Sequence, residues 1–121
     1  MKKIICISFA LGSLTGCASP SLYQWGSYEQ MLYQSYKDST KTEALRKGLE
    51  TQIGSLEQSG LRVAPGLYAE LGTLFLQSGD KRKAIELYKK ERQTWPESNG
   101  LMSAMIKSLE QKPENPSEAS K

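Results

Sequence analysis

The chain contains no histidine in its 121 residues, and this absence removes several kinds of chemistry at once. Histidine supplies the base of Ser-His-Asp and Cys-His nucleophile pairs and is the commonest metal ligand. The sequence also lacks a glycine-rich phosphate loop, because Gly66 and Gly72 lie within or beside predicted helices and no Gly-Lys-Ser/Thr follows them. Carboxylates such as Glu86 and Glu91 are ordinary on a helical surface. We therefore expect a protein that is not an enzyme and holds no metal.

Long apolar runs are lacking too. Residues 4–11 form an uncharged apolar segment, which is shorter than the ~20 residues that a membrane-spanning helix needs. The segment follows Lys2 and Lys3, and a positive region before a short apolar run is the order of a secretion signal. Residues 14–17 then read Leu-Thr-Gly-Cys, the pattern of a lipobox. The sequence therefore predicts the precursor of a bacterial lipoprotein.

We expect the signal to be cut between Gly16 and Cys17, so that residues 1–16 leave as a signal peptide. The Cys17 thiol then carries diacylglycerol and its amine an acyl chain. Two or three chains hold a protein stably on a membrane, since each buried methylene contributes ~0.8 kcal/mol. The alternative is an ordinary signal peptide with an incidental Cys17. Ala18, rather than Asp, follows the cysteine, which in a Gram-negative cell favours the outer membrane, with the protein facing the periplasm.

Free cysteine is absent from the expected mature chain, because Cys6 leaves with the signal and Cys17 is used by lipid. Disulfides, thiolate metal sites and cysteine nucleophiles are thereby excluded, and the covalent lipid takes the place of any cofactor. The formal net charge of +3 includes Lys2 and Lys3, so the mature chain is nearly neutral. Such a balance gives no electrostatic reason to bind nucleic acid.

About a hundred mature residues predict one small domain. Residues 17–26 are expected to form the lipidated N-terminus and a short tether, residues 27–110 a helical domain, and residues 111–121 a tail too polar to pack. Apolar residues recur at helical spacing and no segment carries a strand pattern, so the fold class is all-α. About five helices are expected, near residues 27–36, 41–58, 65–77, 81–94 and 100–109, with a capping box at Thr40 and Glu43 opening the second.

Residues 65–98 span the 34-residue period of a tetratricopeptide repeat. The stretch resembles that family at positions that the repeat specifies, namely Tyr68, Leu71, Gly72, Phe75, Gly79, Ala84, Tyr88 and Pro96. The resemblance implies a stack of antiparallel helical hairpins in which the helices cross closely at Gly72 and Ala84. One departure is Glu91, where a small residue is usual, and this predicts looser packing against the next element. A single repeat cannot bury its own apolar face, so flanking helices are expected to stack on it.

The same resemblance implies a concave groove lined by the first helix of the repeat, at Ala69, Thr73, Leu76 and Gln77. Repeats that bind chaperones clamp a carboxylate with basic and amide side chains, and Ala69 and Thr73 stand at those places here. The groove is therefore expected to be small and mildly apolar. It could hold a peptide or helix of a partner, or be filled by the protein's own first helix.

Two surface features each permit two interpretations. In the aromatic stretch, Trp25, Tyr28 and Tyr36 could fill the core, or Tyr23 and Trp25 could present an aromatic surface to a partner or to lipid headgroups. The basic run within residues 81–92 could be a solvated helix face, or could contact anionic lipid or an acidic partner.

The whole mature chain resembles a family of small, uncharacterised Gram-negative lipoproteins, through residues 22–28, 32–33, 36–38, 65–72 and 95–98. Members of that family tend to be encoded beside a CsgG-like outer-membrane lipoprotein and a second small lipoprotein, which implies a three-component envelope assembly. We therefore expect a lipid-anchored periplasmic adaptor that binds protein, with a CsgG-like lipoprotein as partner. The alternatives are a regulator of a peptidoglycan enzyme, which the short tether disfavours, and a purely structural or immunity-like lipoprotein.

Overall fold

The computed structural model describes residues 22–111, and within this range the chain forms five α-helices and no strand. The elements are α1 (Tyr28–Lys37), the 3-10 turn η1 (Ser39–Lys41), α2 (Thr42–Gln58), α3 (Leu67–Gln77), α4 (Lys81–Thr94), the 3-10 turn η2 (Pro96–Ser98) and α5 (Asn99–Gln111). The all-α prediction is confirmed. The predicted signal peptide, Cys17 and the tail from residue 112 lie outside the described residues. No helix in the described part is long and apolar enough to cross a membrane.

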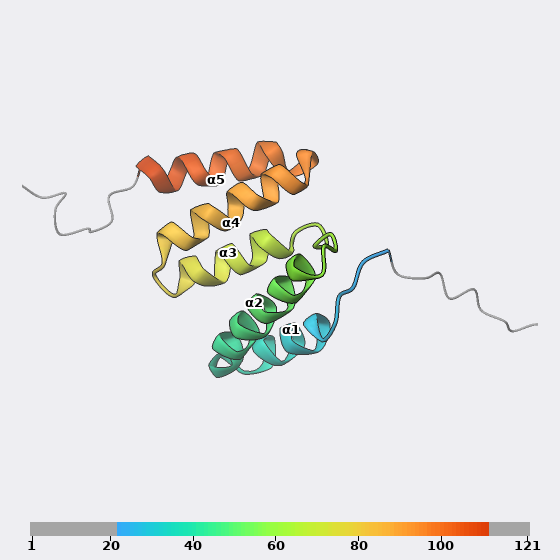
Figure 1. The fold of residues 1–121 in the computed structure, drawn as a ribbon. Helices are drawn as coiled ribbons and strands as arrows, with labels where there is room; N and C mark the ends of the chain where they lie inside the picture. The colour runs from blue at the N-terminus through green and yellow to red at the C-terminus, as the bar shows by residue number, and fades with distance from the viewer. Residues whose placement is uncertain (1–21, 112–121) are drawn as a thin grey trace, which may run out of the picture.

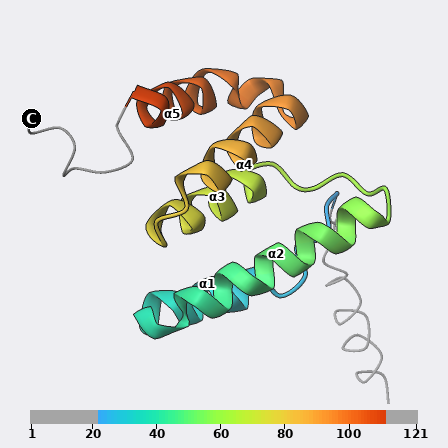
Figure 2. The same ribbon diagram turned by 60° about the vertical axis from the view of Figure 1, so that its left-hand side comes forward.

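The helices form a stack in which neighbours along the chain run in opposite directions (Figure 1). α3 and α4 make a close hairpin, α5 lies on α4, and the α1–α2 pair crosses beneath α3 (Figure 2). The start of the described chain and the α2–α3 and α4–α5 connections gather at one end of the stack (Figure 1). We call this the connection end, formed by residues 22–27, 59–66 and 95–98 together with the first turn of α5. The turns between α1 and α2 and between α3 and α4 lie at the opposite end, called the turn end.

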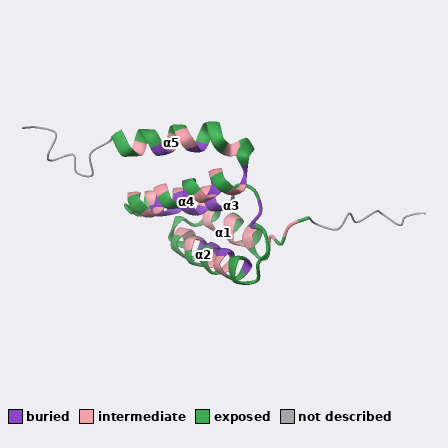
Figure 3. Cartoon of the chain, turned by 45° about the horizontal axis from the view of Figure 1, so that its top comes forward, coloured by how far each residue is buried: buried purple, intermediate pink, exposed green. Residues whose placement is uncertain are grey.

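The core is built from the facing sides of the helices, and the outer sides are exposed (Figure 3). One cluster joins α2 to α3 and the α2–α3 connection, and the four apolar residues that α2 presents at helical spacing are all buried in it: Leu45, Leu49, Ile53 and Leu56. A second cluster joins α4 to α5 through Ala84, Tyr88, Met102 and Ile106. The two clusters lie on opposite sides of the α3–α4 hairpin, which is therefore the centre of the fold.

The start of α2 differs from the prediction, and the capping box at Thr40 and Glu43 is wrong. The Asp38 carboxylate accepts hydrogen bonds from the Thr40 amide at 3.0 Å and from the Thr40 hydroxyl at 2.7 Å. Asp38 thereby caps the short turn η1, which leads directly into α2. Glu43, freed from a capping role, pairs with Arg46 one turn later. An Asp two residues earlier competes successfully for the backbone amide that the box would have used.

α1 is the least buried helix and has no fully buried residue. It packs on α2 where Gly48 makes room for the Met31 side chain, because a Cβ on Gly48 would collide with the Met31 sulfur. Trp25 and Tyr28 are half-buried against the α2–α3 cluster, but Tyr36 is 83% exposed, so the prediction that Tyr36 fills the core is wrong. Eight residues after Tyr28, a helical position has rotated by about 80°, which carries Tyr36 off the packed face.

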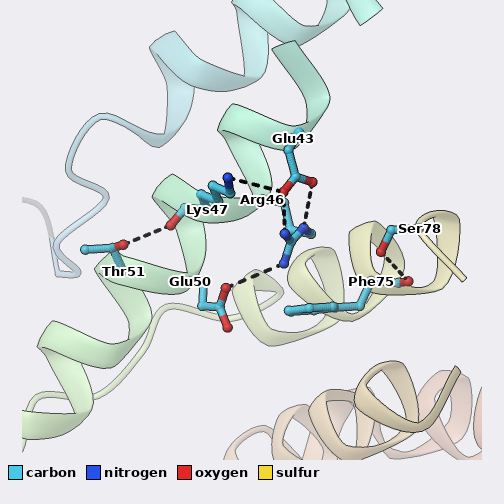
Figure 4. A network of polar contacts seen from close by, with 7 residues as sticks. All are labelled: Glu43, Arg46, Lys47, Glu50, Thr51, Phe75 and Ser78. Atoms are coloured by element: carbon cyan, nitrogen blue, oxygen red, sulfur yellow. Dashed lines mark hydrogen bonds and ion pairs between the residues drawn. The ribbon is translucent and has the colours of Figure 1, made fainter. Parts of the chain in front are cut away.

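Two groups of polar contacts hold α2 against the α3–α4 hairpin. The Arg46 guanidinium lies 4.7 Å from the centre of the Phe75 ring and is held there by Glu43 and Glu50 on its own helix (Figure 4). Nearer the connection end, Glu57 accepts hydrogen bonds from the Tyr68 hydroxyl and from Lys90, both at 2.8 Å. The Lys90 ammonium lowers the pKa of Glu57, while burial and then the bond to Glu57 raise the pKa of Tyr68.

The most buried charged residue is Glu91 on α4, with 1% of its surface exposed. One carboxylate oxygen accepts a hydrogen bond from the Gly66 amide at 2.8 Å and another from the Ser98 hydroxyl at 3.3 Å. Gly66 is the N-cap of α3, with φ at +90°, so α3 begins at Leu67 rather than at Pro65. The looser packing predicted for this position is wrong, because the carboxylate fills the space between α4, the start of α3 and the turn before α5.

Gly72 supplies the first test of this packing. Replacing Gly72 by Ala should destabilise the protein by about 1–3 kcal/mol, because the new Cβ would lie 2.8 Å from the ring of Tyr88, which is fully buried and has no room to move. Gly54, also inside a helix, has nothing within 4 Å of an added Cβ, so Gly54→Ala should stabilise by up to about 1 kcal/mol. Urea unfolding followed by circular dichroism measures both changes. Equal effects of the two substitutions would contradict the close crossing of α3 and α4.

Candidate binding groove

One face of α3 carries three of the predicted groove residues, Ala69, Thr73 and Leu76, at the spacing that places side chains on a single side of a helix. All three are half-buried. Ala69 and Leu76 pack against the cluster that α4 and α5 share. The helix beside this face is α5 and not the protein's own first helix, because α1 contributes no residue to this cluster.

The fully buried Tyr88 of α4 contacts this face of α3. Its hydroxyl lies 3.0 Å from the Thr73 hydroxyl oxygen. Thr73 donates its own proton to the Ala69 carbonyl at 3.0 Å, so Tyr88 is the donor in the contact between the two hydroxyls. Thr73 is thus used to join α3 to α4.

The opposite wall is α5, whose apolar side chains divide between two directions. Met102 and Ile106 are buried against α4, whereas Met105 and Leu109 are only half-buried. Leu76, Met105 and Leu109, with the exposed Ala104 and Ser108, enclose a hollow of about 350 Å³. Leu101 is 65% exposed one helical turn before Met105 and extends the same face toward the connection end. We call this surface the α3–α5 groove.

The lining of the α3–α5 groove determines what it can do. None of its five lining side chains is titratable, and all but Ser108 are apolar. Such a surface offers contact area for one or two apolar side chains of another protein, and no acid, base or nucleophile. Within residues 22–111 no group of three or more His, Cys, Asp and Glu residues is placed to hold a metal ion.

Three of the basic side chains in the run on α4 form ion pairs with carboxylates. Lys83 pairs with Glu86 at 3.3 Å and Lys90 with Glu57 at 2.8 Å. Lys89 reaches Glu110 of α5 at 3.6 Å. Ion pairs on an exposed helix face are screened by solvent and contribute little to stability.

The remaining predicted site residues lie elsewhere. Gln77 lines a separate hollow of about 250 Å³ beside the start of α2, not the α3–α5 groove. Tyr23 packs edge-on against Trp95 with ring centres 5.6 Å apart, and Trp25 lies against Tyr28 at 6.2 Å, so neither forms an open aromatic surface. The aromatic side chains that are most exposed are instead Tyr33 and Tyr36 on the outer side of α1.

Another hollow lies beside α2 and the segment that leads into α1. It has a volume of about 520 Å³, and the polar side chains in its lining include Gln24, Lys47, Thr51 and Gln52. The Gln52 amide donates to the Gln24 carbonyl at 3.1 Å across it. This contact fixes the N-terminal segment on α2 and gives the hollow a structural role.

The α5 wall was only partly visible in the sequence. The sequence predicts a helix near residues 100–109, and helical spacing places Leu101, Met102, Met105, Ile106 and Leu109 on one face, without any division between buried and open members. The width of that face was the signal that part of it would stay uncovered, because it exceeds the width that one neighbouring helix can cover.

Comparisons with known proteins identify one family. Residues 22–105 match the model of a family described as "Domain of unknown function (DUF4810)". The match spans α1 to α4 and the first half of α5, which is more than half of the chain. No curated protein and no solved structure matches significantly.

Two methionines of α5 test whether the groove is open. Met102→Ala should cost about 2–5 kcal/mol, because Met102 is buried and its removal leaves a cavity. Met105→Ala should cost about 1 kcal/mol or less, because Met105 is already partly in contact with water. Both free energies of unfolding come from chemical denaturation. Similar large losses for the two variants would mean that the groove closes in solution.

Proposed function

The chain belongs to the DUF4810 family, a family of unknown function, and from this premise we propose that it is a lipid-anchored periplasmic adaptor in an outer-membrane lipoprotein assembly, acting by binding protein. The partner that we propose is a CsgG-like lipoprotein, on the basis of the gene neighbourhood of the lipoproteins that the sequence resembles. In this proposal the protein carries a covalently bound lipid on Cys17.

The observation that carries the proposal is the α3–α5 groove. Half-buried apolar side chains from two helices face each other there, with no titratable group in the lining. An apolar surface with a polar surround is typical of protein interfaces, where a few apolar side chains contribute most of the binding energy. A site of this composition supports recognition and offers nothing for catalysis.

The α3–α4 hairpin supports the tetratricopeptide-like part of the proposal. Gly72 and Ala84 lie where the two helices cross, with Ala84 fully buried and Gly72 closed in by the Tyr88 ring. The first helix of a tetratricopeptide hairpin lines the concave face of the stack, and α3 stands in that place here. In a longer repeat array, the first helix of the next hairpin would follow α4. The position of that helix is occupied here by α5.

The lipid anchor supports the choice of a partner on the same membrane. Only five peptide units separate Cys17 from Leu22, where the described structure begins, and they reach at most ~18 Å when fully extended. A protein confined so close to a membrane meets other membrane-bound proteins at a raised effective concentration. A regulator that reaches across the periplasm would need a longer tether.

The test is a mild-detergent pull-down of the tagged, lipidated protein from its native membranes, followed by mass spectrometry. The unmodified protein should recover a CsgG-like lipoprotein in constant ratio. Met105→Glu should reduce that recovery at least tenfold, because it places a charge in the apolar groove while leaving the buried face of α5 unchanged.

Lys107→Glu is the matched control, since it puts the same residue on an exposed side of α5 outside the groove, and it should leave recovery unchanged. Circular dichroism checks that both variants are folded. Recovery of a peptidoglycan synthase instead would favour the regulator, and equal losses in both variants would exclude the groove as the binding surface.

A further inference from the structure

Three of the large apolar side chains that are most exposed in residues 22–111 belong to the connection end of the stack. Leu22 is 89% exposed, Leu61 is 46% exposed, and Leu101, in the first turn of α5, is 65% exposed. They come from three segments that are distant in the sequence and that the fold brings to the same end (Figure 1). Single exposed leucines are normal on a protein surface, but three gathered at one end indicate a surface with a partner.

The segment that leads to the predicted lipid anchor is fixed at this same end. Both Tyr23 and Arg62 contact the Trp95 indole. Tyr23 packs edge-on against it, and the Arg62 guanidinium lies 3.9 Å from the centre of its ring. Arg62 also donates a hydrogen bond to the Thr94 carbonyl. The start of the described chain is therefore held to the α2–α3 connection and to the end of α4, at the connection end.

The length of the tether places the connection end beside the membrane. The chain from Cys17 to Leu22 reaches at most ~18 Å, and Tyr23, the next residue, is the one that packs on Trp95. The turn end is separated from this point by the length of the helices: α4 alone has 14 residues, which corresponds to about 21 Å. An anchored protein would therefore present its connection end to the lipid.

The charges at this end are consistent with apolar contact. Glu57 is paired with Lys90, and Glu91 is buried. Arg62 is exposed and would favour anionic headgroups, whereas the exposed Glu97 would oppose them. Since the two largely offset each other, the leucines rather than the charges are the attractive feature, and the favourable partner is the apolar boundary of a lipid layer.

We propose that the connection end, through Leu22, Leu61 and Leu101, is a membrane-contacting surface that seats the domain on the lipid layer holding Cys17. This rests on the lipid anchor of the proposed function. The helices then stand roughly along the membrane normal, with Tyr33 and Tyr36 of α1 pointing into the periplasm. The α3–α5 groove runs outward from the membrane surface along its side.

The test uses the lipidated protein in vesicles of phosphatidylethanolamine and phosphatidylglycerol, without any protein partner. Leu61→Cys and Leu101→Cys each add a thiol at the connection end, and Tyr36→Cys adds one at a comparably exposed apolar position at the turn end. Each new thiol is the only free one in a lipidated mature chain, and it is labelled with a fluorophore that brightens in an apolar environment.

The labels at positions 61 and 101 should brighten at least twofold on vesicles and be quenched by nitroxide-bearing lipids, while the label at 36 should do neither. Three bright labels, or a response at 36 alone, would overturn the proposed orientation, as would labels at 61 and 101 that stay in water. The intact mass of the protein separates the two proposals. A chain without lipid overturns both, whereas a lipidated chain with unresponsive labels overturns the membrane contact and leaves the adaptor proposal standing.

Discussion

The Glu91 carboxylate is the point at which three parts of this small fold are joined. It extends from the last turns of α4 and accepts hydrogen bonds from the backbone amide that precedes α3 and from the serine hydroxyl that precedes α5. Both donors lie at helix N-termini, where the aligned peptide dipoles favour negative charge. The second carboxylate oxygen is buried without a hydrogen-bond partner in the described residues. Both hydrogen bonds of Glu91 are therefore accepted by one carboxylate oxygen, which joins the starts of α3 and α5 to α4.

The candidate groove follows from this arrangement. α5 begins directly after Ser98, so the contact of Ser98 with Glu91 sets where α5 leaves the end of α4. From that start, Met102 and Ile106 pack on α4, and the adjacent side of α5 turns toward Leu76 of α3 without closing on it. Four residues after Glu91, the Trp95 ring contacts Tyr23 and Arg62, so the same stretch of chain also holds the segment that precedes α1. The proposed binding surface and the proposed membrane orientation thus depend on the same part of the fold.

The features that the sequence predicted well are those with local causes. α4 was predicted with its observed bounds because a turn containing Gly79 precedes it and Trp95-Pro96 ends it. The close crossing at Gly72 was predicted from the tetratricopeptide resemblance, in which a small residue stands where the two helices of the hairpin approach each other. Glu91 was misjudged, since its partners are a backbone amide 25 residues away and a hydroxyl in another element, which no local pattern contains. Tyr36 and the division of the α5 face were missed for a related reason: which side of an amphipathic helix is covered depends on the crossing angles of its neighbours.

Amide hydrogen exchange at Gly66, followed by NMR, tests the role of Glu91 most directly. The Gly66 amide has the Glu91 carboxylate as its hydrogen-bond acceptor and precedes the first turn of α3, so helix formation alone does not protect it. In the unmodified protein this amide should exchange slowly. In Glu91→Ala it should exchange at least tenfold faster and the amides of α5 should lose more protection than those of α2, while Glu91→Gln, which keeps an acceptor, should fall between. Unchanged exchange at Gly66 in Glu91→Ala would contradict the account and leave the position of α5 to its apolar contacts alone.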